Sequence, residues 1–230
     1  MISRYGSRSK RLDYLRWKSS SQTDKLTNDD VNILCEYIDK IIYINLDKRT
    51  DRRVQLENEL KLFPAEKVQR FSAVEDRSLG GLGCTKSHIA VLELAKENNW
   101  NTILILEDDM VWNKTNNSIS DLVKLLNNPY DVILLGCTEA FYNTSTFRVY
   151  SALTSVGYVI NSSYYDTLIN NFKQSHDLLY QTRCYPVFAL DQYWRRLQSD
   201  DNWYLLKPSL CIQKPGYSDI VNKFIKYEYN

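Results

Sequence analysis

The sequence lacks three features that would point to a particular partner or compartment: an excess of one charge, a long apolar run and closely spaced cysteines. Its 29 Lys and Arg residues are balanced by 28 Asp and Glu residues, so it has no general attraction for nucleic acid or anionic membranes. No run approaches the roughly 18 apolar residues that a membrane span needs. The five cysteines contain no CxxC pair, which argues against a zinc ribbon and favours a reducing compartment.

The N-terminal segment also lacks the apolar core of a secretory signal, so we expect a cytoplasmic location. Its first twenty residues hold six Lys or Arg and a single acid, Asp13. This composition suits a flexible arm, an electrostatic tether for an anionic partner or a transit-like presequence, and the flexible arm is the favoured reading. We therefore predict a basic arm over residues 1–35 and a single domain over residues 36–230.

What the sequence does contain is an alternation of strand and helix patterns. Short runs rich in β-branched or aromatic residues predict strands at 40–46, 68–74, 102–106, 131–136, 154–160 and 203–208. Apolar residues at helical spacing predict helices at 50–62, 85–98, 119–127, 163–173 and 190–198, with the glycines of 80–83 in a flexible turn. Alternating strands and helices predict a mainly parallel α/β sheet, and uninterrupted apolar strands indicate that helices cover both of its faces.

Three consecutive acids follow one of these strands. Glu107, Asp108 and Asp109 come directly after TILIL (102–106), and ligands of open α/β sheets bind beyond the carboxyl ends of the strands. Like charges this close repel, and a hard divalent ion such as Mg²⁺ or Mn²⁺ relieves the repulsion. The alternative is that Asp108 or Asp109 caps the turn while the other acids are solvated.

Four ordered motifs give the acids a context: INLDKRTDRR (44–53), RFSAVEDR (70–77), GCTKSH (83–88) and LILEDD (104–109). Together they resemble glycosyltransferase family 25, which contains lipooligosaccharide and collagen β-galactosyltransferases, and a looser similarity continues to about residue 220. The resemblance implies a GT-A type, Rossmann-like fold with a mainly parallel twisted sheet flanked by helices. It also implies transfer of a hexose, galactose or glucose, from a UDP-sugar to a glycan or hydroxylysine-type acceptor, with inversion at the anomeric carbon.

The resemblance further implies roles for the acids. The triplet resembles the family's DxD motif, in which Asp109 would bind Mn²⁺ or Mg²⁺ against the diphosphate and Glu107 would lie toward the ribose or the metal. Asp108 would be a further candidate for the donor site, although its side chain is expected to point the opposite way from Glu107 and Asp109 along an extended chain. Asp219, in a closing Ser-Asp-Ile, could supply another oxygen ligand or be a turn residue. Many GT-A enzymes use a late histidine on the metal, but this chain has none after His176.

The remaining candidates for the donor site match the family's motifs: Asn45, Leu46, Arg49, Arg53, Ala73, Asp76, Ser87 and His88. For Arg53 an exposed position on a helix is an equal alternative. Asp76 lies in a run where the family's turn has a glycine and this chain has none, which leaves the local backbone open. For His88 the alternative is a structural role beside an apolar helix face.

An inverting transfer needs a base that takes the proton of the acceptor hydroxyl. Asp191 is the first candidate, although an Asp before YWRRL would also cap a helix, and Glu139 is the second. Two other functions stay open: a catalytically inactive homologue that binds a nucleotide sugar or glycan, and a metal-dependent nucleotidyl or phosphoryl transferase. The second would need a phosphate-binding loop, and the glycines of 80–83 lack the Lys-Ser/Thr that completes one.

Overall fold

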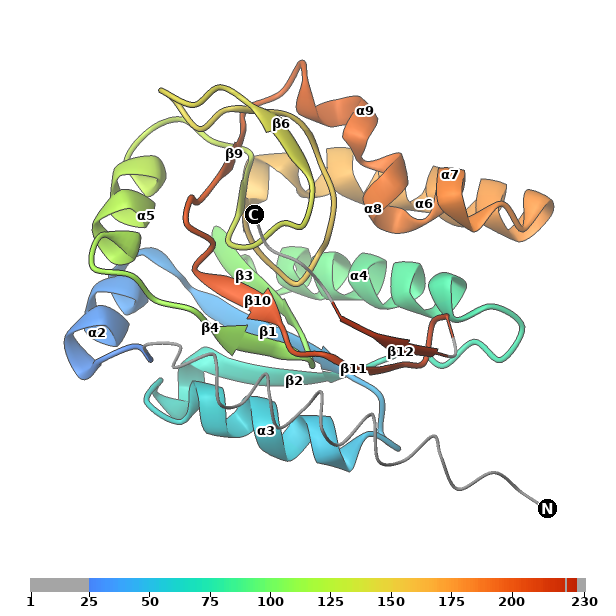
Figure 1. The fold of residues 1–230 in the computed structure, drawn as a ribbon, viewed down its shortest axis with the longest axis horizontal. Helices are drawn as coiled ribbons and strands as arrows, with labels where there is room; N and C mark the ends of the chain where they lie inside the picture. The colour runs from blue at the N-terminus through green and yellow to red at the C-terminus, as the bar shows by residue number, and fades with distance from the viewer. Residues whose placement is uncertain (1–24, 222, 227–230) are drawn as a thin grey trace.

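The computed structural model describes residues 25–221 and 223–226 (Figure 1). Most of the predicted basic arm, residues 1–24, lies outside the described residues. Within the described part of the chain, no helix is long and apolar enough to cross a membrane.

The boundary predicted at residue 36 is wrong, because the fold begins earlier. Helix α2 (Asn28–Tyr37) starts with a capping box between Thr27 and Asp30, whose side chains each bond the other's backbone. Val31 and Leu34 of this helix are buried in the core. An amphipathic, capped helix packs against the sheet, so residues 25–35 belong to the domain.

The centre of the fold is a six-stranded sheet in the order β2-β1-β3-β8-β5-β9. Its strands are β1 (Lys40–Asn45), β2 (Val68–Ser72), β3 (Thr102–Glu107), β5 (Val132–Leu134), β8 (Gly157–Asn161) and β9 (Trp203–Leu205). β1 runs parallel to β2 and β3, and β5 runs parallel to β9, whereas β8 is antiparallel to both of its neighbours. The predicted class, a mainly parallel α/β sheet flanked by helices, is confirmed.

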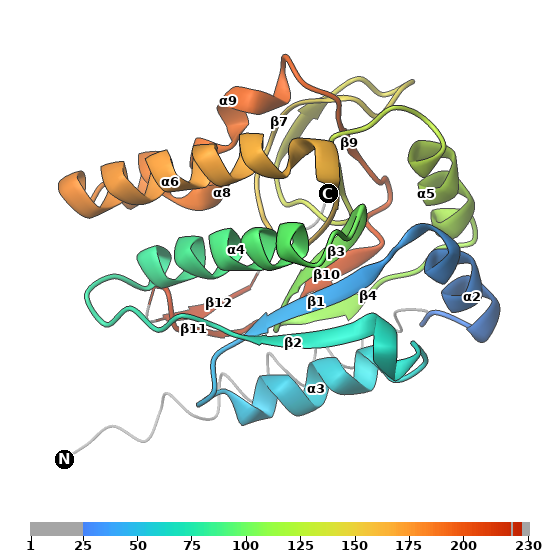
Figure 2. The ribbon, with the colours of Figure 1, turned by 180° about the vertical axis from the view of Figure 1, so that it is seen from behind.

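Helices cover both faces of this sheet, as the apolar strands predicted. In β1, Ile41 and Tyr43 pack in the cluster that contains α2, α3 (Thr50–Leu60) and α5 (Ser118–Leu126). Ile42 and Ile44 face the opposite way and pack in the cluster that contains α4 (Gly80–Glu97) and α6 (Tyr165–Thr182). Figure 2 shows α4 and α6 lying side by side on their face of the sheet, with α3 on the other side.

Short strand pairs extend the fold beyond the central sheet, and the sequence patterns did not predict them. β4 (Met110–Trp112) pairs with β10 (Cys211–Gln213), β6 (Ala140–Tyr142) with β7 (Val149–Ala152), and β11 (Gly216–Ser218) with β12 (Lys223–Ile225), all antiparallel. The first pair matters most for function, since β4 begins directly after the acidic triplet.

Several helix boundaries also differ from the prediction. The glycines of 80–83 form the first turn of α4 rather than a flexible turn, and they allow close backbone contacts. A Cβ atom on Gly83 would lie 2.4 Å from the carbonyl oxygen of Val74, and one on Gly80 would lie 2.8 Å from the Cα atom of Ile220. The helix predicted at 190–198 is divided into α8 (Leu190–Tyr193) and α9 (Arg195–Gln198), which follow α7 (Tyr185–Phe188).

Candidate active site

A cavity of ≈ 420 Å³ lies where the parallel strands β1, β2 and β3 end. Its wall includes the first residues after β1 and β2, the last residue of β3, the start of α4 and the segment 218–220. Nine predicted site residues line it: Leu46, Ala73, Asp76, Ser87, His88, Glu107, Asp108, Asp109 and Asp219. The cavity therefore lies beyond the carboxyl ends of the strands, where ligands of open α/β sheets bind.

Asn45 and Arg49 lie just behind the wall and hold acids that line it. The Asn45 side chain is buried, and its Nδ2 donates a hydrogen bond to Oδ2 of Asp108 over 2.7 Å. Arg49 donates through Nη1 to the carboxylate of Asp219. Both residues contact the site through an acid rather than through the cavity itself.

Arg53 takes the exposed position on the helix that was the alternative for it. Its side chain is 48% exposed, pairs with Glu57 one turn along α3, and does not line the cavity. Arg52 occupies the inward position instead, because successive residues on a helix point about 100° apart. Sequence analysis missed Arg52, although it belongs to the same motif.

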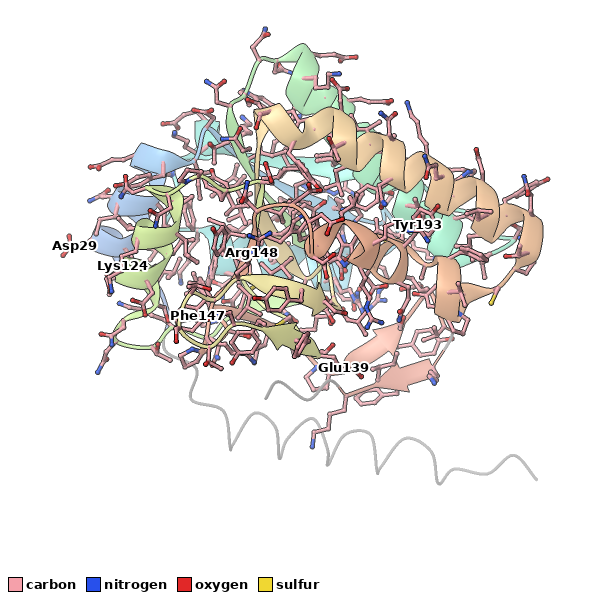
Figure 3. The ribbon with its side chains drawn as sticks, turned by 90° about the horizontal axis from the view of Figure 1, so that it is seen from above. Asp29, Lys124, Glu139, Phe147, Arg148 and Tyr193 are labelled. Carbon is pink, nitrogen blue, oxygen red and sulfur yellow. The ribbon has the colours of Figure 1, made fainter. Side chains whose placement is uncertain are left out.

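Glu139, the second candidate for the general base, does not line the cavity. It is exposed just before strand β6, and Figure 3 labels its side chain. Asp191 lies closer, although it is not a lining residue. Its Oδ2 accepts a hydrogen bond from the backbone N–H of Thr154 over 3.2 Å, and its charge contributes to a raised pKa of Glu107. Burial raises the pKa of Asp191 itself, and this residue lies in the first turn of α8, whose N-cap is Ala189.

One arginine, Arg52, forms ion pairs with two acids of the triplet. Nη1 of Arg52 lies 2.7 Å from Oδ1 of Asp108 and 3.2 Å from Oδ2 of Asp109. Burial raises the pKa of Asp109, an effect that Arg52 opposes, and burial followed by the charge of Asp109 raises the pKa of Glu107. One positive charge thus offsets only part of the repulsion among three neighbouring acids.

One oxygen of the triplet has no partner. Oδ1 of Asp109 is buried and forms no hydrogen bond within the described part of the chain. An orphaned, buried carboxylate oxygen beside a second carboxylate suits a hard divalent ion, which takes oxygen ligands. The side chains present therefore fit the Mn²⁺ or Mg²⁺ that the sequence predicted, with Asp109 and Glu107 as the closest candidates to hold it.

Ser87 and His88 form the α4 side of the cavity. Oγ of Ser87 donates to the carbonyl of Gly83 over 2.7 Å and accepts from the backbone N–H of Val74 over 2.8 Å, so it fixes the loop after β2 against the helix. His88 is 1% exposed, and its Nδ1 lies 2.8 Å from the hydroxyl of Tyr158. Burial lowers the pKa of His88 to about 3, so the ring is neutral.

The sequence of the chain matches the family model described as Glycosyltransferase family 25 (LPS biosynthesis protein) over residues 65–187, more than half of the 230 residues. The chain belongs to glycosyltransferase family 25. The resemblance predicted from the motifs is therefore confirmed, within a range that holds α4 and the acidic triplet. The motif at 44–53 and the similar segments after residue 187 lie outside the matched range. A search of curated protein sequences finds no match.

Several solved structures are similar in fold to this family 25 chain. A glycosyltransferase involved in the glycosylation of the major capsid of PBCV-1 has 11% identity and a TM-score of 0.47, with 78% of this chain and 93% of that chain covered. Mannose-1-phosphate geranyltransferase from Thermus thermophilus has 8% identity and a TM-score of 0.43, covering 73% and 72%. A 4-diphosphocytidyl-2C-methyl-D-erythritol synthase from Anaerococcus prevotii has 12% identity and a TM-score of 0.43, covering 84% and 82%. Likenesses this distant say nothing of activity.

The cavity of this family 25 protein also has basic side chains that sequence analysis missed. Lys48, Arg52 and Arg77 line it together with the acids. Lys48 lies 2.7 Å from Glu75 and 3.6 Å from Asp219, so part of its charge is balanced within the wall. A cavity wall that contains both acids and cations suits an anionic ligand that also carries a metal ion.

Asp76 is the predicted nucleoside contact, and the structure gives its local backbone. Hydrogen bonds from the Ser78 hydroxyl and from Lys86 lower the pKa of Asp76 well below its usual value. Its Oδ1 also accepts from the backbone N–H groups of Ser78 and Leu79. The turn that carries a glycine in the family is thus closed here by the Asp76 side chain.

Proposed function

We propose that this glycosyltransferase moves a hexose from a UDP-sugar to a glycan or hydroxylysine-type acceptor, with inversion and with Mn²⁺ or Mg²⁺ bound at the acidic triplet. Membership of family 25 implies a nucleotide-sugar donor and a glycan acceptor. The identity of the nucleotide, the sugar and the metal belongs to the proposal. So do the inverting course and the cytoplasmic location expected from the sequence.

The single observation that carries the proposal is the buried, unpartnered Oδ1 of Asp109, which has no hydrogen bond within the described residues, in a cavity at the strand ends. Asp109 and Glu107 would hold the ion, which when bound stabilises negative charge on a leaving diphosphate. Lys48 and Arg77 line the same cavity and would attract the phosphates of the donor. Asp219 is paired with Arg49 and Lys48, so we assign it to positioning these cations before metal binding.

Asp191 remains the proposed general base. Its raised pKa makes it a better proton acceptor than an ordinary carboxylate near neutral pH, and the Thr154 N–H fixes its orientation. Its charge contributes to the raised pKa of Glu107, which supports a position near the acidic triplet. Glu139 is exposed and outside the lining, so we no longer propose it as the base.

The test is a screen for UDP release from several UDP-hexoses, with and without Mn²⁺, and with a panel of glycan acceptors. We expect metal-dependent release of UDP, and a loss of at least about 100-fold in Asp109→Asn. Asp166→Asn is the matched control, because Asp166 is an exposed acid on α6 that is paired with Lys96 and should leave the rate unchanged.

Two outcomes would replace the proposal by an alternative. UDP binding without any transfer or hydrolysis across the panel would indicate an inactive homologue. Release of pyrophosphate, or of a sugar 1-phosphate, in place of UDP would indicate nucleotidyl or phosphoryl transfer.

A further inference from the structure

We infer that Cys84, His88 and Glu107 form a second metal site in this protein, one that takes Zn²⁺ rather than Mn²⁺ or Mg²⁺. One ligand atom from each residue, the thiol sulfur, an imidazole nitrogen and a carboxylate oxygen, lies within 4.8 Å of the other two. All three residues line the cavity. The site does not depend on the proposed sugar transfer.

The fold explains why these residues meet. Cys84 and His88 are four residues apart in α4, so they lie on one face of the helix, one turn from each other. Glu107 is the last residue of β3, so it lies at the carboxyl end of a central strand, in the sheet that α4 covers. Two ligands at this spacing on a helix, with a third from a separate element, form a common arrangement of zinc ligands.

A second observation points to a missing ligand. Nε2 of His88 is buried, has no hydrogen-bond partner within the described part of the chain, and lies 4.0 Å from Oε1 of Glu107. That separation is too long for a hydrogen bond. A ring nitrogen that faces a carboxylate at this distance is left unsatisfied, and a cation between the two groups would bind both.

The neighbours of the ligands support the same arrangement. Nδ1 of His88 is within hydrogen-bond distance of the Tyr158 hydroxyl, which leaves Nε2 to bind the metal. Glu107 accepts hydrogen bonds from the Ser155 hydroxyl and, over 3.1 Å, from Nε2 of Gln213. Such contacts fix the orientation of a ligand before the metal arrives.

Distances and donor chemistry select the ion. Tetrahedral zinc with bonds of about 2.0–2.3 Å places its ligand atoms roughly 3.3–3.8 Å apart, so side-chain movements of about 1 Å would close the site. A thiolate and an imidazole favour Zn²⁺ over Mn²⁺ and Mg²⁺, which prefer oxygen ligands. Burial and the charge of Glu107 raise the pKa of the Cys84 thiol, so zinc binding must release its proton.

The site shares Glu107 with the acidic triplet. Zinc held by this carboxylate would remove it from the set that we propose for the donor's metal ion. If the proposed function is correct, Zn²⁺ therefore inhibits transfer in the presence of saturating Mn²⁺. This consequence rests on the proposed function, whereas zinc binding does not.

The experiment adds Co²⁺, a spectroscopic substitute for Zn²⁺, to the full metal-free chain. We expect a sulfur-to-cobalt charge-transfer band that saturates at one sulfur-bound Co²⁺ per chain, and Zn²⁺ should remove the band by displacing this cobalt. Cys84→Ser should lose the band, and His88→Gln should weaken binding at least about tenfold, in the range seen when an interaction at a metal site is removed. The matched control is Cys35→Ser, whose partly buried thiol lies on α2, and it should keep the band.

A second measurement covers variants that fail to fold. Zn²⁺ should slow alkylation of Cys84 in the wild-type chain, as followed by mass spectrometry of its peptide, and leave alkylation of Cys184 unchanged. A wild-type chain without the cobalt–sulfur band, a folded Cys84→Ser variant that keeps it, or equal alkylation of Cys84 with and without Zn²⁺ would overturn the inference. None of these measurements uses glycosyl transfer as its readout.

Discussion

Replacing Arg52 with methionine tests how the acidic triplet is tolerated in the folded protein. The ion pairs of Arg52 with Asp108 and Asp109 are well shielded, with side chains 16%, 11% and 12% exposed. Removing one partner of a buried ion pair costs about 3–5 kcal/mol, because the remaining charge is left uncompensated. Since these side chains keep some contact with water, we expect the lower end, about 3 kcal/mol.

Arg53→Met is the matched control on the same helix. Arg53 and Glu57 form an ion pair whose side chains are 48% and 43% exposed, and such surface pairs contribute below about 1 kcal/mol. Both variants are compared with wild type by urea unfolding in the presence of a chelator. A loss in Arg52→Met no larger than that in Arg53→Met would refute the reasoning.

Manganese supplies a second part of this test. A divalent ion bound by Asp109 replaces the lost positive charge, so Mn²⁺ should stabilise Arg52→Met more than it stabilises wild type. Ligand at about 100 times its dissociation constant adds about 2.7 kcal/mol. Equal stabilisation of the two proteins by Mn²⁺ would show that the ion does not bind beside Arg52.

Three further changes have defined outcomes. Burial raises the pKa of Glu107 in the folded protein, so the free energy of unfolding of metal-free wild type falls as the pH rises from about 4.5 through the folded pKa. Glu107→Gln lacks this loss and should become more stable relative to metal-free wild type between about pH 5 and 8. An advantage in urea unfolding that does not change with pH would contradict this. Gly83→Ala places a Cβ atom 2.4 Å from a backbone oxygen and should lower the stability of the fold by more than about 2 kcal/mol. In the control Gly216→Ala the nearest atoms lie at 3.8 Å, and the loss should be below about 1 kcal/mol. Equal melting temperatures of the two variants would contradict this. Tyr158→Phe leaves Nδ1 of His88 buried without its hydroxyl partner and should cost about 1–3 kcal/mol in urea unfolding, and the absence of any loss would count against this reasoning.

The strands of the central sheet could be predicted because their sequences are strongly apolar. Ile41 to Ile44 and Ile103 to Leu106 are buried on both faces, so no other element type competed at strand length. The strand pair β4–β10 could not be predicted in this way. Each strand has three residues, and about 100 residues of chain separate them, so only the folded structure brings them together.

The residues of the candidate site likewise include some that could be predicted from the local sequence and others that could not. Glu107 and Asp109 lie at the end of a recognisable strand, so their place beyond the sheet could be predicted from the local sequence. The rotation of helix α3 about its axis decides whether Arg52 or Arg53 faces the cavity, and the motif does not determine this rotation. Asp191 and Glu139 depend on how distant segments pack, and for these residues the sequence offered a chemical type but no position.

The pairing of β10 with β4 has a consequence for how the protein is made. Gln213, Ser218 and Asp219 complete the cavity wall, and the N–H of Lys214 bonds the carbonyl of Asp109 over 2.8 Å. During translation the acidic residues therefore leave the ribosome about 100 residues before the segment that encloses them. A nascent chain can build most of its sheet in that interval, but it cannot have a finished cavity until residues 211–220 have emerged.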